Sequence, residues 1–300
     1  MPAVSRDDLV LDGFVPLCRP AARSASLIGL RCLPLHALDP DHAKNNCCWN
    51  RINCDSGRMQ VGIVLESRTD FLLPEWEKLR EEIISCTRCP RLVKHRREIA
   101  FRKKKEFTNW RYWGAPLPGF GDTQAQLLIV GLAPAAHGGN RTGRMFTGDG
   151  SANFLMRALH KAEFANQPIS VHDRDGLQMM NSFMTAVVRC APPQNKPLAS
   201  ELANCSTYFD RELALLSHVR VVLALGQVAF KGYLDHLKRQ GFSTERLKFK
   251  HGWKYPMPPG VPVLIASYHP SRQNTQTGRL TRTMMNAALG VVKSSLAEST

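Results

Sequence analysis

The chain has 300 residues, of which 43% are hydrophobic, and it carries a formal net charge of +15. It can therefore bury a full core, and it is long for a single domain, so we expect one domain with extensions. The positive charge favours a polyanionic partner such as nucleic acid, and less often a membrane surface. No run of about 18 apolar residues could span a bilayer, and Met1–Leu30 has no clean signal-peptide pattern, so we expect an intracellular protein.

The first part of the chain, residues 1–69, differs in composition from the rest. It carries five scattered prolines and has no sustained helical or strand periodicity. We predict a weakly ordered extension over residues 1–69 and a folded domain over residues 70–300. Cysteines of an intracellular chain are reduced thiols or metal ligands rather than disulfides. Five of the nine lie in this extension without repeated spacing, and we predict no site role for them: Cys18, Cys32, Cys47, Cys48 and Cys54.

The domain begins with helical spacing of apolar residues over Phe71–Cys86. A basic stretch follows at Arg91–Lys105, where eight of fifteen residues are Lys or Arg and only Glu98 is acidic. A charge run of this kind usually forms a solvated helix face. Because this one is almost wholly of one sign and directly follows C-x-x-C, contact with phosphates is at least as strong an alternative. Gly114–Asp122 is rich in glycine and proline and is predicted to be a loop.

The remaining chain alternates short apolar runs with helical patterns, which predicts parallel strands covered by helices on both faces. The four predicted strands are Leu127–Val130, Phe183–Val188, Val219–Leu225 and Val263–Ser267. The helical patterns lie at Ser151–Glu163, Ala199–Leu216, Gln227–Arg239 and Arg282–Leu296. Ligands of such sheets bind at the carboxyl ends of the strands. Each predicted strand leads directly into a loop of unusual composition, so we expect one site built from all four loops.

Four cysteines of the domain form two pairs, Cys86 with Cys89 and Cys190 with Cys205. Four thiolates satisfy either a [4Fe–4S] cluster or a tetrahedral zinc ion. Zinc ribbons usually place both pairs as C-x-x-C, and the second pair is too widely spaced for that. Two buried free cysteines beside a coincidental C-x-x-C are a further alternative, because free cysteine is common in cores. The spacing favours a cluster over zinc by only a small margin.

Two of the strand-end loops carry candidate chemistry. The loop Gly131–Gly150 has six glycines in twenty residues, which let its backbone approach a ligand closely. Phe146 in this loop can stack on a base, although a core phenylalanine is the usual fate of such a residue. His269 begins a polar run after the last strand, where its imidazole can donate a hydrogen bond to a developing anion. A structural histidine is the alternative there.

Four motifs carry a resemblance to a known family: GFGD at Gly119–Asp122, GLAPAAHGGNRTGRMFTGD at Gly131–Asp149, VRCAPPQNKP at Val188–Pro197 and SYHPSRQNTQTGRLT at Ser267–Thr281. With CTRCPRLV at Cys86–Val93, the chain from about residue 70 to residue 297 resembles the family 5 uracil-DNA glycosylases, the type B enzymes of prokaryotes. The resemblance implies a three-layer α/β/α fold with a four-stranded parallel sheet. It also implies a [4Fe–4S] cluster held by Cys86, Cys89, Cys190 and Cys205.

The resemblance further implies removal of uracil, and of other deaminated bases such as hypoxanthine, from DNA. A monomeric cytoplasmic enzyme, associated with the nucleoid through its DNA substrate, is the expected form. The segment Gly131–Ala135 offers no acidic side chain to activate water, so Asp149 is the candidate and Asp122 the alternative. A different class of protein is the rival: a non-catalytic DNA-binding or redox-sensing iron–sulfur protein.

The other expected roles follow from base flipping, which brings the target nucleotide into a pocket. We expect His269 to stabilise the departing base, Asn195 to contact the base or the water, and Phe146 to stack on the base. Gly131, Leu132 and Ala133 are expected to shape the pocket floor, and Ser271 and Arg272 to enter the minor groove. Arg141 and Arg144 are expected, like the basic stretch, to contact phosphates.

Overall fold

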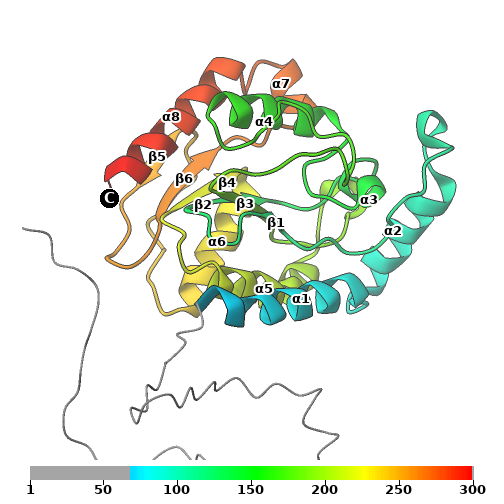
Figure 1. The fold of residues 1–300 in the computed structure, drawn as a ribbon, viewed down its shortest axis with the longest axis horizontal. Helices are drawn as coiled ribbons and strands as arrows, with labels where there is room; N and C mark the ends of the chain where they lie inside the picture. The colour runs from blue at the N-terminus through cyan, green and yellow to red at the C-terminus, as the bar shows by residue number, and fades with distance from the viewer. Residues whose placement is uncertain (1–67, 299–300) are drawn as a thin grey trace, which may run out of the picture. The chain divides into compact units, whose positions relative to one another are not determined.

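The computed structural model describes residues 68–298, and residues 1–67 of the predicted extension, with its five cysteines, lie outside this part of the chain. A six-stranded sheet forms the centre, with strand order β1-β3-β2-β4-β6-β5 (Figure 1). Its four inner strands are parallel to one another: β2 (Leu127–Gly131), β3 (Ser182–Ala186), β4 (Val221–Leu225) and β6 (Val263–Ser267). The four predicted strands are therefore confirmed as one parallel sheet.

Two antiparallel edge strands extend this sheet beyond the sequence prediction. β1 (Phe120–Gly121) pairs with β3, and β5 (Trp253–Tyr255) pairs with β6. They have only two and three residues. Segments this short show no recognisable alternation of apolar and polar residues, so periodicity could not reveal them.

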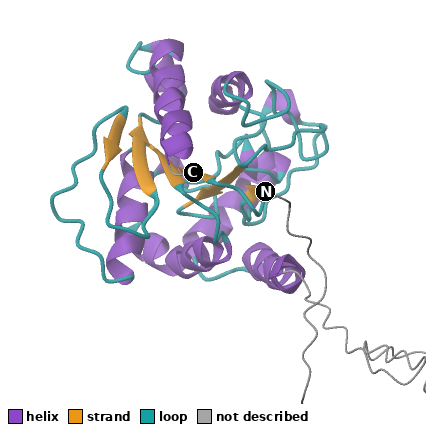
Figure 2. Cartoon of the chain, turned by 60° about the vertical axis from the view of Figure 1, so that its left-hand side comes forward, coloured by secondary structure: helices purple, strands orange, loops and turns teal. Residues whose placement is uncertain are grey.

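Helices cover both faces of the sheet, which confirms the three-layer α/β/α prediction (Figure 2). Alternate residues of each inner strand point to opposite faces, as the pleat requires. On one face, Leu128 and Val222 pack with α5 (Ala199–Leu215) and α6 (Gln227–Arg239). On the other, Ile129 and Leu223 pack with α4 (Gly150–Lys161) and α8 (Arg282–Glu298). α1 (Arg68–Ser85) lies outside α5 and packs on it through Leu79 and Ile83.

The predicted basic stretch forms α2 (Pro90–Arg102), followed by the short helix η2 (Lys105–Phe107). α2 stands at the side of the sheet, beside the short helix α3 (Gly139–Thr142) (Figure 1). Two further short helices lie in the strand-end loops, η3 (Pro193–Asn195) after β3 and α7 (Arg272–Gln276) after β6. No helix among residues 68–298 is long and apolar enough to cross a membrane.

The parallel register fixes where the loops meet. Gly131 at the end of β2 pairs with Ala186 at the end of β3, and Leu225 of β4 pairs with Ser267 of β6. The four loops that follow these strands therefore leave from one edge of the sheet, as the sequence predicts.

Candidate active site at the carboxyl ends of the strands

The loop after β2 folds back so that Phe146 covers the end of its own strand. A Cβ atom at Gly131 would lie 2.9 Å from the Phe146 ring, so only glycine permits this approach. Phe146 itself has a φ of 46°, in the left-handed region that side chains other than glycine rarely adopt. A strained backbone at a half-buried aromatic residue is typical of a residue held for a function.

Asp149 closes the same loop as the N-cap residue of α4. Its Oδ1 accepts a hydrogen bond of 2.9 Å from the backbone N–H of Ala152. Its other oxygen lies against Gly138, where an added Cβ would overlap it. Burial raises the pKa of the Asp149 carboxyl above its usual range, although the helix N–H groups oppose that effect. The loop thus holds a partly desolvated carboxylate in a fixed position.

His269 lies beside Phe146, with the ring centroids 6.1 Å apart and the ring planes at 31°. Its backbone carbonyl accepts a hydrogen bond of 2.8 Å from the side chain of Asn274. Burial lowers the pKa of His269 to about 4, so its imidazole is neutral at neutral pH. The imidazole makes no hydrogen bond to any of the residues 68–298, so its donor is available to a ligand.

α7 joins this group from the side of β6. Ser271 is its N-cap, and the Ser271 hydroxyl accepts a hydrogen bond of 3.3 Å from the N–H of Asn274. Arg272 is exposed, and its side chain lies against Gly150, the first residue of α4. His269 thus lies beside Phe146, and Arg272 lies beside the start of α4, next to Asp149.

The remaining predicted pocket residues lie at the same edge, but less closely. The carbonyl of Leu132 accepts a hydrogen bond of 3.0 Å from Val188, which ties the loops after β2 and β3 together. Leu132 and Ala133 are half-buried against the core on the α5 and α6 face. Asn195 is exposed at a φ of 56° and makes no side-chain hydrogen bond to the described residues. Its position leaves its side chain open to a ligand.

Asp122, the alternative to Asp149, lies at the amino ends of the parallel strands, opposite the carboxyl ends where the other site residues lie. Its N–H donates to the carbonyl of Ser182, the first residue of β3, and its Oδ1 accepts from Gln124. The amino ends of the parallel strands are a full strand length away from the site. Asp122 is therefore excluded as the group that holds the water.

The prediction that Arg141 and Arg144 contact phosphates is wrong, because both are buried. Arg144 forms an ion pair with Asp175, with N–O distances of 2.8 and 2.9 Å. The Arg141 guanidinium lies over the rings of Phe107 and Trp110 and donates to the carbonyls of the loop itself. Both arginines hold the loop in shape.

The four cysteines of the domain come from three separate segments and are all free thiols. Cys86 and Cys89 lie between α1 and α2, Cys190 lies in the loop after β3, and Cys205 lies on α5. Cys89, Cys190 and Cys205 are buried in one apolar cluster. Burial, together with the three other thiols nearby, raises the pKa of the Cys190 thiol to about 12, although the charge of Arg96 opposes that effect.

No group of three or more Cys, His, Asp or Glu residues within the described range is arranged to hold a metal ion. The ligands of a [4Fe–4S] cluster bind four different iron ions, so they surround a volume rather than one point. A thiol with a raised pKa needs nearby positive charge to ionise, and iron supplies it. The donor set therefore fits a cluster.

Two supporting residues escape prediction from the sequence. His251 accepts a hydrogen bond of 3.1 Å from the N–H of Tyr268 and stacks on its ring at 4.8 Å. His137 accepts from or donates to the hydroxyl of Tyr112 at 3.0 Å. No local sequence pattern marks His251. By contrast, Asn274, whose side chain donates to the His269 carbonyl, could have been identified from the Ser271-x-x-Asn274 spacing of an N-cap.

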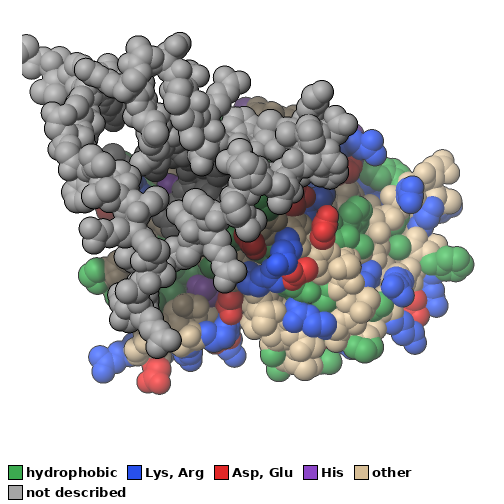
Figure 3. Space-filling view, turned by 60° about the horizontal axis from the view of Figure 1, so that its bottom comes forward, with side chains coloured by type: hydrophobic (Ala, Val, Ile, Leu, Met, Phe, Trp, Pro, Cys, Tyr) green, Lys and Arg blue, Asp and Glu red, His purple; other side chains and the backbone are tan. Residues whose placement is uncertain are grey.

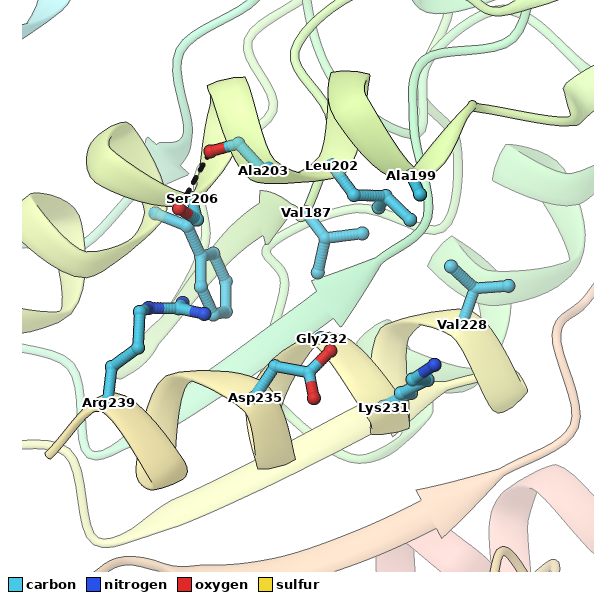
Figure 4. A pocket seen from close by; sticks show the side chains of 11 residues that line it. Val187, Ala199, Leu202, Ala203, Ser206, Val228, Lys231, Gly232, Asp235 and Arg239 are labelled. Atoms are coloured by element: carbon cyan, nitrogen blue, oxygen red, sulfur yellow. Dashed lines mark hydrogen bonds between the residues drawn. The ribbon is translucent and has the colours of Figure 1, made fainter. Parts of the chain in front are cut away.

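A separate hollow of about 400 Å³ lies between α5 and α6 (Figure 4). Its apolar floor includes Val187 and Leu202, and its rim carries Lys231, Asp235 and Arg239. It contains none of the predicted site residues.

Comparison with known proteins identifies the family of this chain. Residues 118–293 match the uracil DNA glycosylase superfamily. A type-5 uracil-DNA glycosylase of Thermus thermophilus is 49% identical over 208 residues, which cover 69% of this chain and 92% of the relative. One of Pyrobaculum aerophilum is 46% identical over 199 residues, covering 66% and 84%. A type-4 uracil-DNA glycosylase of Sulfurisphaera tokodaii is 26% identical over 197 residues, covering 65% and 74%. The chain belongs to the uracil DNA glycosylase superfamily.

Proposed function

We propose that this protein is a uracil-DNA glycosylase that hydrolyses the N-glycosidic bond of deoxyuridine in DNA and so starts base excision repair. The observation that carries the proposal is the meeting of Asp149, Phe146 and His269 at the strand ends of a chain in this superfamily. The type-5 relatives support uracil as the base removed.

The residues of the site act on the two sides of the scissile bond, some on the base and others on the sugar. The flipped base stacks on Phe146 and rests on the backbone of Gly131, Leu132 and Ala133. The bonding electrons leave with the base, and the neutral His269 imidazole donates a hydrogen bond to the anion that develops. Asp149 orients a water molecule toward the sugar carbon and stabilises its positive charge. Oxygen from that water bonds to the carbon, and one of its protons passes to the released base.

Asn195 and α7 provide the remaining contacts. The exposed Asn195 amide is assigned to the base edge or to the attacking water. Ser271 and Arg272 are assigned to the minor groove beside the gap that the flipped nucleotide leaves. We infer that the protein acts as a monomer in the cytoplasm; its positive charge suits DNA as the substrate.

We further propose that other deaminated bases, such as hypoxanthine, are accepted. The pocket floor at Gly131–Ala133 offers backbone groups and apolar side chains rather than polar side chains that would reject a second base. Discrimination by hydrogen bonding requires such fixed polar partners. Competition between uracil and hypoxanthine duplexes for the same enzyme measures the preference; complete indifference to the hypoxanthine duplex would contradict the proposal.

Cys86, Cys89, Cys190 and Cys205 are assigned as the ligands of a [4Fe–4S] cluster. When bound, the cluster joins the α1–α2 junction to the loop after β3, which carries Asn195. Its role is structural. A brown protein with absorbance near 400 nm and about four irons per chain supports the assignment, whereas a colourless protein containing one zinc contradicts it.

The function is tested with a duplex that contains a single uracil. After incubation with the protein, alkali cleaves the strand wherever a base has been removed, and a gel separates the fragments. The proposal predicts cleavage at the uracil position only. Tight binding to the duplex without cleavage would instead support the rival, a non-catalytic DNA-binding protein.

A further inference from the structure

One face of α2 carries an excess of positive charge; its single acidic residue, the exposed Glu98, lies one helical turn from both Lys94 and Arg102. Lys94, Arg97 and Arg102 are exposed on this face and have no hydrogen bond or ion pair with any of the residues 68–298. By contrast, Arg91 forms an ion pair with Glu201, and Arg96 is buried and donates to backbone carbonyls. The basic stretch is thus divided between structural arginines and a face that presents its charge to solvent.

The same face presents a large aromatic side chain to water. Phe101 lies one helical turn beyond Arg97 and is 88% exposed, more than any other large hydrophobic residue described. A helix face that served only solubility would have no use for this residue, since its exposure to water is unfavourable. Cations that alternate with an aromatic ring are typical of surfaces that bind nucleic acid, where the ring packs on a base or sugar.

α1 provides a comparison within the same molecule. It exposes Glu75, Glu77 and Glu81 among Lys78 and Arg80. Figure 3 looks toward the side of α1 and shows acidic and basic side chains intermingled where the surface is not covered in grey. α2 carries one acidic residue, Glu98, among five basic ones, so its excess of positive charge is a property of α2 and not of every surface helix of this basic protein.

α2 is attached to the catalytic loop. The carbonyl of Arg96 accepts a hydrogen bond of 3.1 Å from Asn140 of α3, the helix in the middle of that loop. α7 approaches the start of the next helix, α4, through Arg272, which lies against Gly150. In Figure 1, α2 lies beside α3, and α7 lies apart from both, near α4.

A hollow of about 420 Å³ lies beside α3, where the chain continues from η2. Arg111 and Arg174 line it and are exposed, as is the acidic Asp173 between them, and Trp110 forms part of its wall. The buried guanidinium of Arg141 lies beneath. This hollow extends the positive surface of α2 toward the catalytic loop.

We propose that a DNA-gripping surface, formed by Lys94, Arg97, Phe101, Arg102, Arg111 and Arg174, holds the backbone of the substrate beside the flipped nucleotide, on the side away from α7. The inference rests on the proposed function for its ligand, DNA. Charge complementarity selects this occupant, because the backbone of a duplex presents a dense row of phosphates to such a surface.

The test compares Arg97→Gln/Arg102→Gln with a matched control, Lys231→Gln/Lys238→Gln, which removes two exposed charges from α6. The probe is a duplex with one 2′-fluoro-deoxyuridine, which resists cleavage, and affinity is measured over a salt series. We expect the double variant of α2 to bind roughly tenfold more weakly, with a slope of log K against log salt that is less steep by about 2. The control should match the wild-type protein.

Phe101→Ala separates the aromatic contact from charge. It should weaken binding about fivefold without changing the salt slope, since no phosphate contact is lost. Removing the arm of the duplex that contacts this surface should abolish the difference between the α2 variant and the wild type. Removing the arm on the other side of the uracil should preserve the difference. Equal effects from both sides would overturn the placement.

Unchanged affinity and salt slope in the α2 variant would overturn the inference, and excision of uracil by the wild-type protein would leave the proposed function standing. Conversely, an altered salt slope in the α2 variant, with no uracil released by the wild-type protein, would refute the proposed function but support the DNA-gripping surface.

Discussion

At the scale of residues, burial acts in opposite senses on the two groups that flank the scissile bond. It raises the pKa of Asp149 and lowers that of His269, and in each case it disfavours the charged form. His269 needs no charge, because a neutral imidazole can donate a hydrogen bond. Asp149 does need its charge, and the N–H groups at the start of α4 help to retain it.

This difference predicts the pH dependence of excision. Because the pKa of Asp149 is raised, the carboxylate is protonated as pH falls through a range higher than that of an ordinary carboxyl, and activity is lost with it. His269 has a pKa of about 4 and stays neutral across that range. We expect the acid limb of the rate to lie at higher pH than an ordinary carboxyl would place it, and a single-turnover pH profile measures it. In Asp149→Asn the limb should vanish together with most of the rate; a limb that persists would assign it elsewhere.

His269→Ala should lower the rate of base release by about 10²–10³-fold, the usual loss when one hydrogen-bond donor to a developing anion is removed. Binding of uncleaved DNA should change little. His218→Ala is the matched control, since His218 is exposed in the loop before β4, at the opposite edge of the sheet. Near-normal excision by His269→Ala would refute its role.

His251 is predicted to position His269 through Tyr268. His251→Phe keeps a stacked ring but removes the acceptor of the Tyr268 N–H, so the catalytic loop can shift. We expect kcat to fall about tenfold with KM for DNA nearly unchanged, because small displacements are costly in oriented catalysis. His251→Asn can accept the same hydrogen bond and should recover much of the rate. Equal losses in both variants would indicate a purely structural residue.

At the scale of elements, the loop from Gly131 to Gly150 depends on close packing of its own backbone. Gly138→Ala places a methyl group where the Asp149 carboxylate now lies. The carboxylate must move, and we expect kcat to fall about 100-fold while thermal stability changes little. Gly290→Ala is the control, since Gly290 lies in α8 with no neighbour within 4 Å of an added Cβ. An active Gly138→Ala enzyme would show that Asp149 is not held as described.

The longer elements could be predicted because burial gives their apolar residues a regular pattern along the sequence. Gln227–Arg239 is predicted with the bounds that α6 has, and the four inner strands are continuous apolar runs because both faces are covered. α3 and α7 have only four and five residues, too few for a helical period to show. They depend instead on contacts with distant segments, such as Asn140 with Arg96.

At the scale of the whole molecule, the topology explains why the sequence points to the carboxyl ends of the strands as the candidate site. Parallel strands send all their loops to one edge, so Asp149 and His269 are expected to meet although 120 positions separate them. Ion pairs between separate segments leave no recognisable pattern in the sequence. The pairing of Arg144 with Asp175 is set by folding, and for that reason the sequence suggested a DNA contact where the structure has an internal bond.

The most direct test of the central claim is a count of released bases. A duplex with one deoxyuridine is treated with excess protein in water enriched in ¹⁸O, and mass spectrometry detects free base and sugar. The account predicts one uracil per duplex, one ¹⁸O atom on the exposed sugar carbon, and loss of both signals in Asp149→Asn. A duplex recovered intact from its complex with the wild-type protein would contradict it.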